Sequence, residues 1–249
     1  MVSLVPEPIF YIGSFSITNT ILDTLFVDFV LFVLIITISR GIKIVPNLFQ
    51  NVIELIIKTF YDLTEQIAGE RTKKIFPFFM SFFIFILIAN WSEFIPGFSS
   101  IGFFHHGEQG EKTLVPLFRS ATSDLNATLA LAMISAVATH FLSVRTLGIK
   151  EYIGRYFSLN PINLFVGILE LIGEFTKIIS LSFRLFGNIF AGGVVLGIIS
   201  GIFAIIIPLP FLLLEIIVGF VQALIFGMLT MAFMAILTTP HNPQHAKEV

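Results

Sequence analysis

Four charged side chains lie within one long apolar stretch, Ile162 to Ile207: Glu170, Glu174, Lys177 and Arg184. A charge in the middle of a bilayer costs at least ~2.5 kcal/mol on insertion scales. Such residues are rare unless they pair with one another or take part in ion or proton transfer. These four residues are therefore the first candidates for chemistry.

Several polar residues of this stretch are spaced so that they share one face of a helix with Arg184. At about 100° per residue, offsets of four, seven and fourteen residues fall within roughly 40° of one line along the helix. The residues with these offsets are Glu170, Lys177, Ser180 and Asn188. The spacing predicts a polar stripe with Arg184 near its middle.

Arg184 lacks an acidic partner on its own helix. Glu174 lies three residues before Lys177, so these two can pair, whereas the turns beside Arg184 supply only neutral polar side chains. Arginine cannot lose its proton in a protein. Two interpretations follow: a structural ion pair with Glu215 on the next apolar segment, or a counter-ion that comes from another chain or from a transported ion.

The next apolar segment carries its own polar face. Glu215 and Gln222 are seven residues apart and therefore share a face, and Gly219 between them allows close approach of a neighbouring helix. The orientation derived below places Glu215 in the outer half of the membrane, and the charged residues that precede Arg184 in the inner half. The pattern predicts two polar half-pathways separated by a cation.

The composition of the chain indicates a membrane setting. Of its 249 residues, 56% are hydrophobic and 12% are charged, and the mean hydropathy is +0.96. Soluble domains carry about 25% charged residues. This balance excludes a disordered chain, a nucleic-acid-binding protein and a soluble enzyme. The absence of cysteine excludes disulfides, thiolate metal sites and cysteine nucleophiles.

The apolar runs predict an all-α integral membrane protein, a single membrane domain over residues 1–249 with about five crossing helices. Residues 47–69 have apolar side chains at helical spacing and charges opposite, which predicts an amphipathic helix lying in the membrane interface. Residues 1–19 carry no Lys or Arg, unlike a secretory signal, so we expect an outer segment followed by a retained span. The predicted spans are 20–39, 75–95, 125–144, 162–207 and 211–237.

The basic residues predict the orientation. Ten Lys and Arg residues flank the runs on one side and only Lys112 and Arg119 on the other, and basic loops stay in the cytoplasm. The N-terminus is therefore expected outside and the C-terminus inside. The stretch 162–207 is twice as long as a span, so it either breaks near Gly187 to Gly193 or runs strongly tilted. Only the tilted arrangement leaves the C-terminus inside.

The sequence resembles subunit a of the F-type ATP synthases, bacterial type, over nearly its whole length. The resemblance is carried by SLSFRLFGNIFAGG (180–193), VQALIFGMLT (221–230) and IANWSEFIPG (88–97). It implies a proton-conducting stator subunit of the Fo sector that is not an enzyme by itself and needs no cofactor. It also implies a long tilted hairpin formed by the last two helices.

The resemblance further implies partners and residue roles. The partners are a ring of c-subunits, peripheral-stalk b subunits, the remaining synthase subunits, membrane lipid and the translocated H+, in a bacterial plasma membrane. Arg184 matches the essential arginine that faces the c-ring carboxylate, with Asn188 and Gln222 beside it. Glu170 and Lys177 match the inner route, to which Glu174 and Ser180 are adjacent. The positions that match the outer route are Asn90, Glu93, Asp124 and Asn126.

One departure concerns the outer route. A common bacterial pattern has Glu after FAG and His on the returning helix, but this chain has Gly193 and Glu215 at those positions. We expect that the carboxylate has moved across the helix pair and that Gly193 leaves room for Glu215.

Other interpretations of the polar residues are weaker. His105, His106, Glu108 and Glu111 are metal-ligand types, but adjacent histidines in a glycine-containing loop are typical of a solvated surface, so no metal is expected. An intramembrane hydrolase built on Glu170 and Glu174 lacks a histidine on the same segment, since His140 lies on another. A cation exchanger that works without a ring is the remaining alternative.

Overall fold

The computed structural model describes residues 6–13, 15–95, 101–106, 112–157, 161–202 and 207–239. Within them the chain is mainly helical. The helices are α1 (Asn19–Gly41), α2 (Leu48–Ala68), α3 (Thr72–Ser92), α4 (Leu125–Leu147), α5 (Ile149–Tyr156), α6 (Pro161–Ile202) and α7 (Pro208–Leu237). Short 3-10 turns, Gly69–Arg71 and Ala121–Ser123, precede α3 and α4.

Five helical stretches of the described residues are long and apolar enough to cross a membrane. They comprise α1, the pair α2 and α3 taken together, α4, α6 and α7. The prediction of an all-α integral membrane protein is therefore confirmed. The helix ends follow local signals: α6 and α7 begin at prolines, and α4 ends at Gly148, whose φ of 85° favours glycine.

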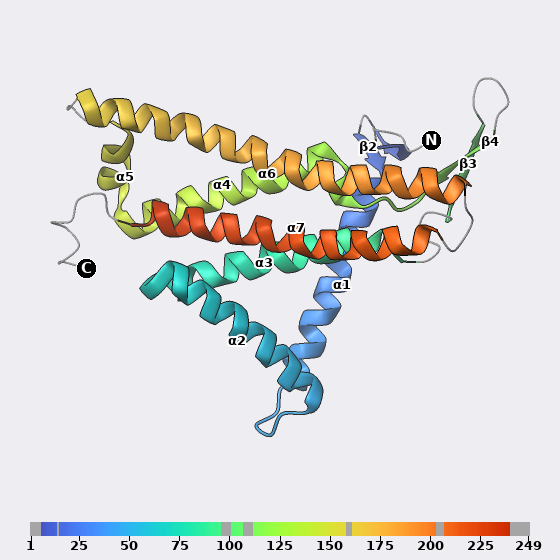
Figure 1. The fold of residues 1–249 in the computed structure, drawn as a ribbon, viewed down its shortest axis with the longest axis horizontal. Helices are drawn as coiled ribbons and strands as arrows, with labels where there is room; N and C mark the ends of the chain where they lie inside the picture. Colours follow the sequence, from blue (N-terminus) through green and yellow to red (C-terminus); the bar gives the residue numbers. More distant parts are fainter. Residues whose placement is uncertain are drawn as a thin grey trace.

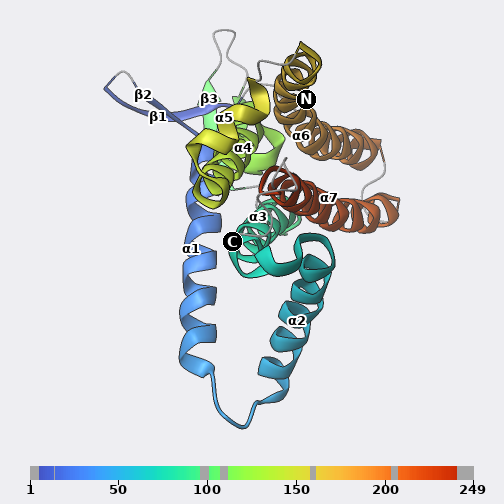
Figure 2. The same cartoon turned by 90° about the vertical axis from the view of Figure 1, so that its left-hand side faces the viewer.

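Four of the long helices run alongside one another, and α1 crosses them. In Figure 1, α3, α4, α6 and α7 follow the longest axis of the molecule, and the view in Figure 2 looks nearly along them. In both views α1 stands steeply across this group, so α1 and the α6–α7 hairpin cannot both stand upright in one membrane.

Helix α6 is continuous. It spans 42 residues without a break near Gly187 to Gly193, which rules out the first of the two arrangements left open above. At 1.5 Å per residue it is about 63 Å long, whereas a bilayer core is about 30 Å thick. A helix of this length fits within a bilayer only if it is strongly inclined.

Helix α2 is amphipathic, and most of its apolar face is uncovered within the chain. Phe60 and Leu63 pack against buried residues of α3 and α7. Towards the start of the helix, Leu48, Phe49 and Leu55 are exposed. These side chains have the placement expected of a helix that lies on a lipid surface.

Three small elements were not predicted from the sequence. Strands β1 (Pro8–Ile12) and β2 (Phe15–Thr18) form one antiparallel hairpin, and β3 (Gly102–His106) and β4 (Lys112–Pro116) form another. The third is α5, which follows α4 directly after Gly148. All three elements are too short for hydrophobic periodicity to reveal them, because that pattern is detected over longer stretches of sequence.

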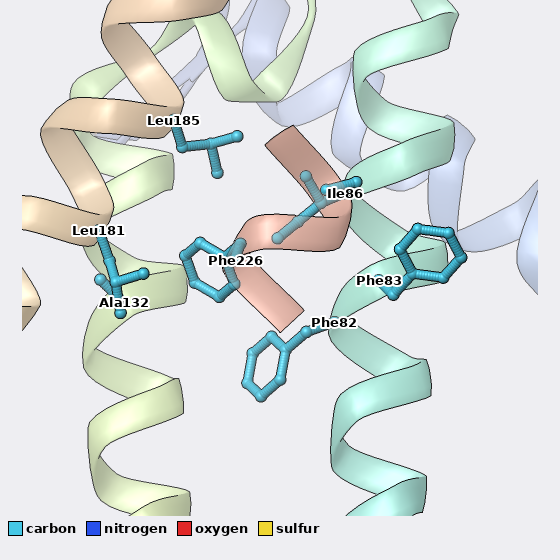
Figure 3. Close-up of a cluster of buried hydrophobic side chains, with 8 residues drawn as sticks. Phe82, Phe83, Ile86, Ala132, Leu181, Leu185 and Phe226 are labelled. Carbon is cyan, nitrogen blue, oxygen red and sulfur yellow. The ribbon is translucent and has the colours of Figure 1, made fainter. Parts of the chain in front are cut away.

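The buried centre of the helix group is an apolar layer. It consists of buried side chains from four helices: Phe82, Phe83 and Ile86 of α3, Ala132 of α4, Leu181 and Leu185 of α6, and Ala223 and Phe226 of α7. Figure 3 shows the labelled members of this layer converging between the helices, with Phe226 near the middle. We refer to these eight residues as the apolar layer.

Candidate ion-translocation site

The guanidinium of Arg184 lies on the exposed face of α6. Its Nη2 is 3.4 Å from the Ser180 hydroxyl one turn earlier, as the predicted stripe requires. No ion pair joins it to a carboxylate of the described residues, Glu215 included. The structural pair with Glu215 is therefore absent, and Arg184 presents its charge to whatever lies beside α6.

Asn188 and Gln222 join α6 to α7 next to Arg184. The Asn188 amide donates to Gln222 Oε1 over 2.8 Å, and the Gln222 side chain is buried while Asn188 is exposed. This contact brings together the two residues that the resemblance grouped beside the arginine. It also fixes the rotation of the α7 polar face toward α6.

The Glu215 carboxylate is buried between α6 and α7. Its side chain is 4% exposed, and Oε1 has no hydrogen-bond partner among the described atoms. It lies against Gly192, where any side chain would collide with it. The expectation that Gly193 makes this room is corrected, because one residue along a helix turns the side-chain direction by about 100° and points position 193 elsewhere.

Gly193 faces a second carboxylate. A Cβ at this position would lie 3.1 Å from Glu93 Oε1. Part of the Glu93 side chain reaches the surface, and its carboxylate lies near enough to that of Glu215 for the two to interact electrostatically. Glu93 and Glu215 therefore form an acidic pair beside the two glycines of α6.

Asn90 holds α3 against α7 at Gly219. Its amide donates to the Gly219 carbonyl over 2.9 Å, and its Oδ1 accepts from the Thr122 hydroxyl over 2.7 Å. A side chain at 219 would lie 3.3 Å from the Asn90 Cβ. Gly219 thus permits the close approach that the sequence suggested, and its neighbour is Asn90 of α3.

Asp124 and Asp23 tie α1 to the outer end of the helix group. Asp124 caps α4 by accepting from the Asn126 backbone, and it also accepts from the Thr20 hydroxyl. Asp23 is fully buried and accepts from Ala121 N and from the Ser92 hydroxyl, while its Oδ1 has no partner in the described structure.

Sequence analysis did not single out Asp23. Glu170 was noticed because it is an acidic residue inside an apolar run. Asp23 lies inside the apolar run 20–39, so the same criterion could have identified it.

Glu174 and Lys177 pair as predicted, and a histidine joins them. Lys177 Nζ is 2.7 Å from Glu174 Oε1, and it also lies 4.4 Å from the centre of the Phe233 ring on α7. His140 Nε2 of α4 lies 3.7 Å from Glu174 Oε2. His140 lies on a different segment, as noted from the sequence, but the inference that no histidine is near these acids is wrong, because the packing of α4 against α6 brings it there.

Glu170 pairs with a residue that the sequence placed in a loop. Arg155 of α5 contacts Glu170 Oε1 through Nε and Nη2, both at 2.7 Å. The same guanidinium donates to the Ile236 and Leu237 carbonyls at the end of α7. Helix α5 thus positions a cation that links α6 to the last turn of α7, where free carbonyls attract positive charge.

Along α6 the apolar layer lies between polar residues on both sides, and each of the other three helices adds a polar residue on one side. On α3, α6 and α7, the outer residues Asn90, Asn188 and Glu215 lie on one side of it in sequence. On α4 and α6, His140 and Glu174 lie on the other side. Arg184 is at the level of the layer, between Leu181 and Leu185, but on the opposite, exposed face.

The histidine loop lies largely outside the described residues. The structure gives the backbone of His105 and His106 in β3 but not their side chains, and Glu108 and Glu111 fall outside the described ranges.

Fold and site together define a multi-pass membrane protein with charged residues arranged for ion translocation. Over residues 21–235 the sequence matches the family described as ATP synthase A chain. The chain belongs to this family.

Individual relatives cover most of the chain. ATP synthase subunit a of Moorella thermoacetica is 31% identical over 230 residues, which are 92% of this chain and 95% of that protein. ATP synthase subunit a of Legionella pneumophila is 31% identical over 227 residues, 91% of this chain and 89% of that protein. A sodium-ion-specific subunit a of Propionigenium modestum is 35% identical over 222 residues, 88% of this chain and 73% of that protein.

Membership of the family gives the chain its general role. It is an Fo stator subunit of the ATP synthase that takes part in ion translocation, and it is not itself catalytic. Other ATP synthase subunits are its partners.

Proposed function

We propose that the chain provides two offset half-channels for protons to the carboxylate of a rotating c-ring. A proton enters from outside along Glu93, Asp124 and Glu215 and binds a c-subunit. After nearly a full turn of the ring it leaves along the inner set that includes Glu170 and Lys177. Proton flow is thereby coupled to rotation and to ATP synthesis.

One observation carries this proposal: along α6 the apolar layer lies between polar residues, and at the same level Arg184 stands on the exposed face without an ion pair among the described residues. Charged groups enter apolar surroundings only at high cost, so this layer hinders a direct route through the interior. A partner that carries the ion past Arg184 completes the path. The permanent charge repels a proton between the half-channels and favours the ionised form of an arriving carboxylate.

The face around Arg184 suits an apolar helical partner. Phe183 and Ile179 beside it are more than half exposed, as is Ile217 of α7. In the assembled enzyme these side chains would contact the c-ring or lipid. The b subunits of the peripheral stalk are proposed as further partners, in a bacterial plasma membrane.

The decisive experiment measures proton flux with and without the ring. We expect vesicles with the complete synthase to pump protons on ATP addition in sodium-free medium, and vesicles with a complex assembled without c-subunits to be tight to protons. Proton conduction without c-subunits would favour a self-contained exchanger. Pumping that requires Na+ would show that the transported ion is sodium, as in the name of the Propionigenium relative, and not the proton.

The proposed orientation is testable because the chain has no cysteine. We expect Ile101→Cys, in the predicted outer loop, to react with a membrane-impermeant maleimide added outside intact cells. Thr146→Cys, at the inner end of α4, is expected to react only in inverted vesicles. The reverse pattern would overturn the N-terminus-out topology, and the cysteine-free parent chain measures background labelling.

A further inference from the structure

An inner polar cluster joins three helices and contains a group that the proposed function does not use. We define it as His140 of α4, Tyr152 of α5, and Glu174 and Lys177 of α6. His140 Nε2 lies 3.7 Å from Glu174 Oε2, and His140 Nδ1 lies 3.0 Å from the Tyr152 hydroxyl. Both ring nitrogens of His140 therefore face a group that can exchange or share a proton.

The cluster borders a cavity of about 370 Å³ between α4, α5 and α6 that is open on one side. His140, Tyr152 and Glu174 lie in its wall, which is otherwise mainly apolar. A water molecule takes up roughly 30 Å³ in the liquid. The cavity therefore has room for several waters beside the imidazole, on the inner side of the apolar layer.

Resting on the half-channels proposed above, we propose that His140 is a proton-transfer residue of the inner route, between Glu174 and the water in this cavity. The O–H bond of a protonated Glu174 breaks as its proton binds His140 Nε2, which leaves a carboxylate and an imidazolium. The imidazolium then releases one proton to a cavity water, and the neutral ring returns. One proton moves inward, and neither residue is consumed.

The surrounding charges suit this direction. Lys177 Nζ lies 2.7 Å from Glu174 Oε1 and attracts the negative charge that its carboxylate carries after the transfer. Farther along, Arg155 and Glu170 neutralise each other. Burial raises the pKa of both Tyr152 and Tyr156, so their hydroxyls stay protonated, and the Tyr152 hydroxyl orients the His140 ring without adding charge. On the α7 side, the Phe233 ring packs against Lys177 of the cluster.

A purely structural role does not explain the choice of histidine. Glu174 is already neutralised by Lys177, so a second cation is not needed for its burial. Most of the cavity wall is apolar, and an apolar side chain would pack there without desolvating a polar ring. Histidine is the side chain whose ordinary titration range lies near neutral pH, which is what a relay there requires.

The test uses the complete synthase in inverted vesicles, whose inner face meets the medium. ATP hydrolysis coupled to rotation is measured in vesicles made leaky to protons, so that the buffering of an added base does not affect the rate. We expect His140→Ala to lower the rate about ten-fold. Added imidazole should restore part of it by entering the enlarged cavity, whereas pyrazole, of the same shape but a far weaker base, should not.

Controls separate the relay from a structural role and from the proposed function itself. The neighbouring Thr139→Val removes a buried hydroxyl that bonds only within α4, and it should leave the rate unchanged. The size-matched His140→Gln should lose rate most steeply toward alkaline pH. If the His140→Ala complex loses its c-ring, the pH dependence of the His140→Gln rate still tests whether His140 transfers protons.

Two results would overturn the inference: parent rates in both His140 variants, or a loss that imidazole and pyrazole affect alike and that does not vary with pH. Arg184→Ala is run beside them. If it is inactive while the His140 variants are normal, the half-channels stand and only the relay fails.

Discussion

Replacing Arg184 by alanine is expected to abolish ATP-driven proton pumping and ATP synthesis while the complex still assembles. The guanidinium is exposed and makes no ion pair with the described residues, so its removal breaks no internal contact beyond the long one to Ser180. What it removes is the fixed charge at the level of the apolar layer. Pumping by purified synthase in vesicles, with recovery of c-subunits in the same preparation, measures both effects.

Lysine at this position should restore function only in part. A lysine ammonium can lose its proton when it is desolvated, whereas a guanidinium keeps its charge. Ser180→Ala, which removes the one described hydrogen-bond partner of Arg184, serves as a control for side-chain orientation and should have a much smaller effect. Normal pumping by the Arg184→Ala complex would contradict the central proposal.

The second large effect is expected at Glu215. The variant Glu215→Gln keeps the shape of the side chain but cannot bind and release a proton, so we expect transport to fall by about 10². The carboxylate is buried against Gly192, with Glu93 on the neighbouring Gly193 side. Initial pumping rates measured from mildly acidic to mildly alkaline pH provide the measurement, because a group that passes protons on depends on the pH of the medium.

Matched variants locate the effect of Glu215→Gln. Glu54→Gln changes an exposed carboxylate of α2 and should leave transport unchanged. The double change Gly193→Glu with Glu215→His restores the common bacterial arrangement, and we expect part of the rate to return. Parent rates in Glu215→Gln across the pH range would show that the outer route runs through Glu93 and Asp124 alone.

Local signals predicted the features that depend on one helix. The long apolar runs gave the spans, and the offsets around Arg184 gave a stripe whose contact with Ser180 is present. The pair of Glu174 with Lys177 needed only their three-residue spacing. Each of these depends on the 3.6-residue period, which a sequence carries directly.

Features that depend on how two helices meet could not be predicted in the same way. His140 reaches Glu174 because of the position of α4 along α6, and Glu215 meets Gly192 because of the rotation of α7 against α6. A shift of one residue in either helix turns a side chain by about 100°, so apolar periodicity alone does not decide between neighbouring positions. Arg155 shows the same limit, since α5 is too short to have been recognised.

The apolar layer also determines where the membrane voltage acts. Hydrated polar routes carry charge and hold little electric field, whereas a layer such as Phe82, Ile86, Leu185 and Phe226 acts as an insulator between two conductors. The potential therefore falls mainly across this thin layer, at the level of Arg184. Each elementary charge that crosses it at 100 mV gains about 2.3 kcal/mol. With the half-channels proposed above, the electrical work of the motor is thus done across this apolar layer.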